Sequence, residues 1–190
     1  LSIKDGATIR GIVFDGASEV ADAIRIDDTV TGAPVVISGC TVRNYTNRFV
    51  YVSLSGKIES LTIDDCIFIG ADNSTTNKAI YASSAHTQVE TLSVTNSTFL
   101  NFNTGSNYFF RINCGEELVL MPVVLIDHCT FYNCYDRRGV YLYNAGRSTI
   151  KNCISAFSER RDDTKSFTAY GDESIVKNVI SYNVDLYGSA

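Results

Sequence analysis

Residues 61–70 read LTIDDCIFIG, and residues 124–134 read VLIDHCTFYNC. Both stretches place an aliphatic residue, two polar residues, a cysteine and, two positions later, a phenylalanine in the same order. The pattern occurs seven times along the chain when the cysteine position, here called the anchor, also admits isoleucine, serine or valine. The anchors are Ile12, Cys40, Cys66, Ser97, Cys129, Cys153 and Val179, and successive anchors are 24 to 32 residues apart. A repeat of this length predicts a solenoid, in which each repeat forms one turn and buries its apolar face against its neighbours.

Each repeat also contains a second stretch in which apolar and polar residues alternate. These stretches are AIRID (23–27), VYVSL (50–54), AIYAS (79–83), FFRIN (109–113), VYLYN (140–144) and FTAYG (167–171). A period of two residues indicates a β-strand, and the chain shows neither an apolar period of 3.6 residues nor the frame of a leucine-rich repeat. The sequence therefore predicts an all-β solenoid with several short strands in each turn.

The residue before each anchor belongs to a restricted group of types. These residues are Gly11, Gly39, Asp65, Asn96, His128, Asn152 and Asn178. Glycine, asparagine, aspartate and histidine are the residues that most readily adopt a left-handed backbone. We therefore predict a two-residue corner at the same place in every turn.

The corner sequences IKNC (150–153), VKNV (176–179) and VTNS (94–97) resemble those of right-handed parallel β-helix proteins, the group that includes pectate lyases, chondroitinase B and related bacterial carbohydrate-active or surface proteins. The resemblance covers about residues 7–185. It implies a right-handed, single-stranded parallel β-helix of about seven coils, with coils ~4.8 Å apart and a rod on the order of 30 Å long. It also implies a secreted, periplasmic or cell-surface location. We expect residues 1–190 to form a single domain of this kind, taken from a longer chain that supplies the caps.

Composition agrees with one domain of ordinary size, because 45% of the residues are hydrophobic and the net charge is only −5. No run of about 18 apolar residues is present, so the sequence predicts no membrane span. The overall acidity argues against nucleic acid as a partner. The oligomeric state is left open.

Four of the six cysteines occupy anchor positions, where we expect the side chain to point inward. Neighbouring coils would bring Cys40 close to Cys66, and Cys129 close to Cys153, at a separation that permits a disulfide. Other repeats place isoleucine, serine or valine at the anchor, however, so the position accepts any small or medium-sized filler. We predict free, buried thiols and no zinc site, since no CxxC pair is present.

The second stretch of each repeat predicts a face for binding. If Ile24, Val50, Ile80, Phe110, Val140 and Phe167 point inward, the residues that follow them point outward. The candidate substrate-binding residues on this outer face are Arg25, Tyr51, Tyr81, Asn113, Tyr141 and Tyr143. Tyrosine rings stack on sugar rings, and arginine binds carboxylate or sulfate through two hydrogen bonds. The alternative is that these side chains only pack along one another on exposed strands.

The loops that lead into this face are rich in basic residues and favour an acidic polysaccharide as the partner. The basic residues are Arg43, Arg48, Lys78, Arg137, Arg138, Arg160, Arg161 and Lys165. Asp136, Glu159, Asp162 and Asp163 lie in the same loops, so a solvated network of salt bridges is the alternative there.

The resemblance implies lyase chemistry, in which a basic residue removes a proton beside a carboxylate. Arg111, Arg138 and Lys165 are the catalytic candidates on that basis. Calcium is possible by the same resemblance, but the sequence reveals no ligand cluster, and no pair of carboxylates for glycoside hydrolysis is apparent. Enzymatic activity therefore stays open. The chain is predicted to be either a polysaccharide-lyase-like module or a noncatalytic glycan-binding module; a structural or adhesive stalk is the alternative, and a phage-type spike is a third hypothesis.

Overall fold

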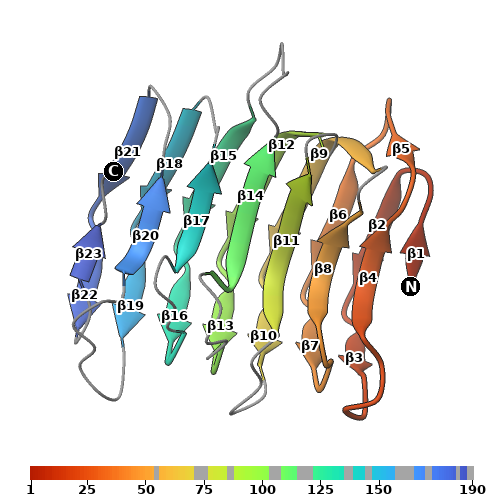
Figure 1. The fold of residues 1–190 in the computed structure, drawn as a ribbon, viewed down its shortest axis with the longest axis horizontal. Coiled ribbons are helices and arrows are strands. Elements are labelled where there is room, and N and C mark those ends of the chain that lie inside the picture. Colours follow the sequence, from red (N-terminus) through yellow and green to blue (C-terminus); the bar gives the residue numbers. More distant parts are fainter. Residues whose placement is uncertain are drawn as a thin grey trace.

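The structure is a computed structural model, and it describes residues 1–53, 56–70, 77–84, 88–102, 108–114, 122–134, 139–143, 147–156, 165–169, 173–182 and 185–187. All regular secondary structure in these residues is β-strand, arranged in three parallel sheets (Figure 1). The predicted fold class, an all-β parallel solenoid, is confirmed. Within the described residues there is no helix of the length and apolarity needed to cross a membrane.

The three sheets, named A, B and C here, each run the length of the solenoid. Sheet A contains β1 (Ser2–Ile3), β4 (Asp22–Ile26), β8 (Arg48–Val52), β11 (Lys78–Ser84), β14 (Phe110–Cys114), β17 (Val140–Tyr143), β20 (Lys165–Ala169) and β23 (Asp185–Tyr187). Sheet B contains β2 (Ala7–Arg10), β6 (Val35–Ser38), β9 (Lys57–Asp64), β12 (Gln88–Thr95), β15 (Val123–Asp127), β18 (Arg147–Lys151) and β21 (Glu173–Lys177), with β5 (Thr29–Val30) paired to β9. Sheet C contains β3 (Val13–Asp15), β7 (Thr41–Arg43), β10 (Ile67–Ile69), β13 (Thr98–Leu100), β16 (Thr130–Tyr132), β19 (Ile154–Ala156) and β22 (Ile180–Tyr182).

The chain visits the sheets in the order B, C, A and then begins the next coil. Figure 1 shows sheet A at the front, with sheets B and C behind it and the coils side by side along the long axis. Every step from one coil to the next is therefore a parallel strand pair, and the register of these pairs decides which side chains become neighbours.

The corner between sheets B and C lies where the sequence predicts it. All seven residues that precede the anchors have positive φ, between 51° at Asp65 and Asn96 and 64° at Gly11. Side-chain amides then link adjacent coils along this corner. Asn96 Nδ2 donates to Asp64 Oδ1 at 2.8 Å, and Asn152 Nδ2 donates to Asp127 Oδ1 at 2.9 Å. The corner is therefore a hydrogen-bonded column as well as a repeated backbone conformation.

A second column of left-handed residues follows sheet C, and the sequence analysis did not predict it. Asn44, Asn101 and Asn133 have φ of 58°, 58° and 53°. Asn133 Nδ2 donates to Asn101 Oδ1 at 3.2 Å, so the same type of inter-coil contact is used twice in a turn.

Stacked side chains fill the interior. The rings of Phe68, Phe99 and Phe131 lie on neighbouring strands of sheet C and stack with centroids 5.0 Å apart at both steps. The anchors of the middle coils are buried with them. Ile12 is the exception among the anchors in its exposure: it lies in the first coil and is 45% exposed.

The cysteines whose side chains the structure describes are free and buried, as predicted: Cys40, Cys66, Cys129, Cys134 and Cys153. The sulfur of each anchor cysteine also lies within hydrogen-bond distance of two carbonyl oxygens, one from its own coil and one from the preceding coil, between which its single S–H is shared. The Cys66 Sγ, for example, lies 3.2 Å from the Asp64 carbonyl oxygen and 3.5 Å from that of Ile37. Burial raises the pKa of the Cys66 thiol to about 11, so this thiol is neutral at physiological pH.

Candidate binding face on sheet A

Strand pairing brings the predicted binding residues of sheet A into register. One row across adjacent strands contains Arg25, Tyr51, Tyr81, Arg111, Tyr141 and Thr168. Asn113 and Tyr143 form part of the neighbouring row. The inward residues that precede the first row, from Ile24 to Phe167, are all fully buried. Strand alternation therefore places this row on the outer surface of sheet A.

Two of the predicted catalytic residues cannot be assigned to the face from their side chains. Arg138 lies outside the described residues. Lys165 begins β20, within sheet A, but its side chain is outside the described part of the chain. Arg111 is the catalytic candidate whose side chain the structure places on the face.

A third row of side chains flanks the face, and sequence alternation alone did not reveal it. The row consists of residues that come two positions before an inward residue: Asp22, Arg48, Lys78 and Tyr108. Strict alternation along a strand would make these side chains point inward as well. The residue between is buried as well, as Phe49 and Phe109 show, so the period of two is broken at the start of these strands. Arg48, Lys78 and Tyr108 consequently reach the outer surface, whereas Asp22 is only 8% exposed.

Ion pairs neutralise the arginines at the N-terminal end of the face. Arg48 binds Asp22 through two hydrogen bonds, Nε to Oδ1 at 2.8 Å and Nη2 to Oδ2 at 2.9 Å. Arg25 Nη1 lies 3.2 Å from Asp22 Oδ2, and Arg25 Nη2 lies 2.9 Å from Asp27 Oδ1. The hydrogen bond from Arg25 lowers the pKa of Asp27. Both carboxylates are therefore already occupied by cations of the same face.

The same arginines cover the first tyrosine of the row. The Arg48 guanidinium carbon lies 3.5 Å from the centroid of the Tyr51 ring, and that of Arg25 lies 5.4 Å from it. Tyr51 is only 8% exposed as a result. Its ring contributes a cation–π contact within the protein and offers little surface to a ligand.

Arg111 has a different environment at the centre of the face. Its guanidinium carbon lies 4.4 Å from the ring centroid of Tyr108, 5.9 Å from that of Tyr81 and 5.8 Å from that of Tyr141. Arg111 Nη1 donates to the Tyr108 hydroxyl. Among the described residues no carboxylate pairs with Arg111, and its Nε, which is buried, has no hydrogen-bond partner.

The aromatic rings form a continuous row around this arginine. Tyr108 stacks on Tyr141 with centroids 5.7 Å apart, and Tyr141 stacks on Tyr143 with centroids 5.8 Å apart. Burial raises the pKa of the Tyr108 hydroxyl, and the nearby charge of Arg111 opposes this rise. Tyr141 is 6% exposed, whereas Tyr81, Tyr108 and Tyr143 are partly exposed. The accessible part of the face is therefore the region around Arg111.

A calcium ion does not fit the described residues of this face. The carboxylates that could serve as ligands, Asp22 and Asp27, are bound by arginines. Within the described ranges there is no group of three or more histidine, cysteine, aspartate or glutamate side chains able to hold a metal ion.

A repeated pattern in the sequence marks Tyr108 as an outward residue, although strict alternation predicts that it points inward. Tyr108 precedes Phe110 by two positions, as Lys78 precedes Ile80 and Arg48 precedes Val50. A polar or aromatic residue recurring at this position marks a further outward row. The ion pairs of Asp22 with arginines of two coils could not be predicted from the sequence, because they depend on the register between coils.

Comparison with known proteins gives one match. A family model matches residues 2–104, which is more than half of the 190-residue chain and includes Arg25, Tyr51 and Tyr81. Neither a curated protein nor a solved structure matches the chain. The chain thus belongs to the family described as Domain of unknown function (DUF4957).

Proposed function

We propose that this chain is a β-solenoid module that binds an acidic polysaccharide on the outer face of sheet A. The observation that carries the proposal is the environment of Arg111. Three tyrosine rings surround its guanidinium, and no described carboxylate neutralises it. Tyrosine and arginine side chains are enriched where proteins bind partners, because they combine apolar surface with hydrogen-bond donors.

The surroundings of Arg111 favour an anion over a neutral ligand. The Lys78 ammonium lies 5.3 Å from the centroid of the Tyr108 ring, so a second positive charge flanks the same ring. A guanidinium offers a planar pair of donors to the two oxygens of a carboxylate or a sulfate. The rings of Tyr81 and Tyr143 can then lie against the apolar faces of neighbouring sugars.

The resemblance to pectate-lyase-like proteins and a secreted or cell-surface location form part of this proposal. Polysaccharide lyase activity is not part of this proposal, because the reaction needs a base in addition to Arg111. Arg138 and Lys165 are the candidates for such roles, and their side chains lie outside the described part of the chain. We therefore propose binding as the function of the face.

A structural stalk is the second candidate, and one observation favours it. Tyr51 and Tyr141 are almost fully covered by their neighbours, as expected for side chains that only pave a sheet. On this alternative, removing Arg111 lowers the stability of the protein but changes no affinity. Measuring stability together with affinity separates the two candidates.

The test is isothermal titration of the protein with oligogalacturonate, a sulfated glycosaminoglycan oligosaccharide and a neutral dextran oligosaccharide. We expect one of the two acidic ligands to bind and Arg111→Ala to weaken that binding about tenfold to a hundredfold, because a charge-assisted hydrogen bond contributes about 1.5–3 kcal/mol. Arg147→Ala is the matched control, since Arg147 lies on sheet B and pairs with Glu173 there. Equal affinities of Arg111→Ala and the unaltered protein, or no binding of either acidic ligand, would contradict the proposal. Ultraviolet absorbance of the same mixtures reports any unsaturated product and hence lyase activity.

A further inference from the structure

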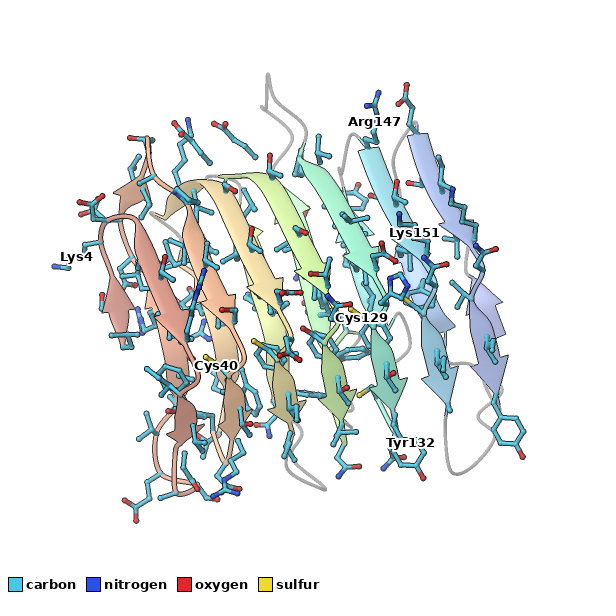
Figure 2. The ribbon with its side chains drawn as sticks, turned by 180° about the vertical axis from the view of Figure 1, so that it is seen from behind. Lys4, Cys40, Cys129, Tyr132, Arg147 and Lys151 are labelled. Atoms are coloured by element: carbon cyan, nitrogen blue, oxygen red, sulfur yellow. The ribbon has the colours of Figure 1, made fainter. Side chains whose placement is uncertain are left out.

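A depression lies on the side of the solenoid opposite the binding face. It has a volume of about 670 Å³ and lies at the end of the first strands of sheet B, next to the corner with sheet C. Its lining includes Arg10, Ser38, Thr62 and Asp64. Figure 2 views the molecule from this side, and Cys40, which follows Gly39 in the chain, is labelled there.

The depression exists because two coils lack a side chain at the corner. Later coils place aspartate, asparagine or histidine at this position, whereas the first two place Gly11 and Gly39. A Cβ atom added to Gly11 would meet no atom within 4 Å, and one added to Gly39 would meet only the Gly11 nitrogen, at 3.8 Å. The space above both residues is therefore open. A larger residue at either corner position would occupy it.

The polar groups around this space are of both kinds, donors and acceptors. The Asp64 carboxylate accepts hydrogen bonds from Thr95 Oγ1 at 2.6 Å and Asn96 Nδ2 at 2.8 Å, which lower its pKa and fix its orientation. Among the described residues, the Arg10 guanidinium and the Ser38 and Thr62 hydroxyls have no side-chain hydrogen-bond or ion-pair partner. Neither Arg10 nor Ser38 is buried, so these groups are available to a ligand.

The charge of the lining argues against an acidic ligand. One arginine, Arg10, and two carboxylates, Asp64 and Asp65, give a net charge of −1, which disfavours the acidic sugars proposed for sheet A. A carboxylate accepts hydrogen bonds from adjacent sugar hydroxyls, a guanidinium donates to them, and the serine and threonine hydroxyls do both. The depression is open to solvent, so a ligand would lie against the strands with one side exposed.

We propose that this depression is a second carbohydrate site, which binds a neutral saccharide of one or two sugar residues. Val36 is the apolar side chain of its lining, so hydrogen bonds dominate recognition. The inference is independent of the function proposed for sheet A, because the two sites share no residue and prefer ligands of different charge. Together they would allow the module to contact an acidic and a neutral glycan at the same time.

The corner column itself supplies the variant that tests this inference. Gly39→Asn introduces the residue found at the same position in three later coils, where asparagine adopts a φ of 51° to 53° against 59° at Gly39. The substitution therefore fills the depression with a side chain that the corner backbone accepts. Arg10→Ala is a second variant, which removes a donor without altering the corner. Lys177→Ala is the matched control, because it removes a cation from the equivalent position at the other end of sheet B.

The measurement is a titration followed by amide chemical shifts, with cellobiose, mannobiose and galactobiose as neutral probes, digalacturonate as the acidic probe and glucosamine as the cationic probe. We expect at least one neutral disaccharide to give saturable shifts at Ser38, Gly39 and Thr62. We also expect its affinity to fall tenfold or more in Gly39→Asn and in Arg10→Ala, and to stay unchanged in Lys177→Ala. The inference is overturned if no neutral probe gives saturable shifts, if the acidic or cationic probe binds more tightly at these residues, or if Arg10→Ala binds as the unaltered protein does.

Discussion

Anchor residues combine packing with hydrogen bonding, which explains why the repeat uses cysteine there. The thiol is small and apolar enough for the interior, and it also donates to corner carbonyl oxygens, each of which already accepts a backbone N–H of the preceding coil. Ser97 fills the same position in the fourth repeat and donates to the Thr95 carbonyl oxygen at 2.7 Å. The sequence indicated a small inward filler, but the donor role depends on where the carbonyl groups of the corner point.

Removing an anchor thiol should therefore lower stability beyond the loss of its volume. We expect Cys66→Ala to reduce the free energy of unfolding by about 1–2 kcal/mol, from the lost donor and the small cavity. Cys66→Ser should have a smaller effect, since serine preserves the donor and already serves at position 97. Urea unfolding of both variants measures the difference, and a larger loss for serine than for alanine would refute the donor role.

The Asp64 carboxylate predicts a pH dependence of stability. Hydrogen bonds from Thr95 and then Asn96 lower the pKa of Asp64 in the folded protein. A carboxyl group whose pKa is lowered by folding contributes stability that is present above its unfolded pKa of about 4 and is lost as the pH falls through the folded value. Unfolding free energies measured from pH 6 to pH 2 should therefore fall less steeply in Asp64→Asn than in the unaltered protein. Parallel curves would show that Asp64 makes no such contribution.

At the scale of the structural element, the corner between sheets B and C shows what local sequence determines. Residue type alone located all seven left-handed residues, because only a few residues tolerate this conformation. The partners of the corner side chains were not predictable in the same way. Asn96 binds Asp64 of the preceding coil, a contact that requires the register between strands 31 to 32 residues apart.

Two substitutions of Asn152 separate the backbone role of the corner from its hydrogen bonds. Asn152 has a φ of 53°, donates to Asp127 and accepts from Asn178. Asn152→Gly keeps the conformation but loses the hydrogen bonds, so we expect a loss of about 1 kcal/mol in the free energy of unfolding. Asn152→Ala also introduces left-handed strain and should lose about 1–2 kcal/mol more. Equal losses in thermal or urea unfolding would contradict the assignment of strain to this corner.

At the scale of the whole molecule, the parallel stacking of coils gives the solenoid two chemically different sides, the outer face of sheet A and the side of sheet B that carries the depression. The face of sheet A was predictable as a row of arginines and tyrosines, since alternation fixes which side of a strand a residue occupies. The contacts that cover each of these side chains were not predictable. Tyr51 is shielded by Arg48, an arginine that begins the same strand, and Tyr141 is shielded by Tyr108 of the preceding coil. The depression at Gly11 and Gly39 was missed for a related reason, since it is produced by missing side chains.

The stacked phenylalanines should make the middle coils the most stable part of the solenoid. Phe99 stacks on both Phe68 and Phe131, whereas Phe14 lies in the first coil and is partly exposed. We expect Phe99→Ala to reduce the free energy of unfolding by about 3–5 kcal/mol, and Phe14→Ala to reduce it by clearly less. Calorimetric unfolding of both variants tests this, and an equal loss would mean that contacts between coils in the centre add nothing beyond burial.

The central claim, that Arg111 recognises the acid group of a bound glycan, is tested most directly by a crystal structure of the protein soaked with an acidic tetrasaccharide that binds in solution. The account predicts a carboxylate or sulfate about 3 Å from the Arg111 guanidinium, with sugar rings against Tyr81 or Tyr143. A bound tetrasaccharide whose acid groups contact other residues and leave Arg111 and its tyrosines unoccupied would contradict it.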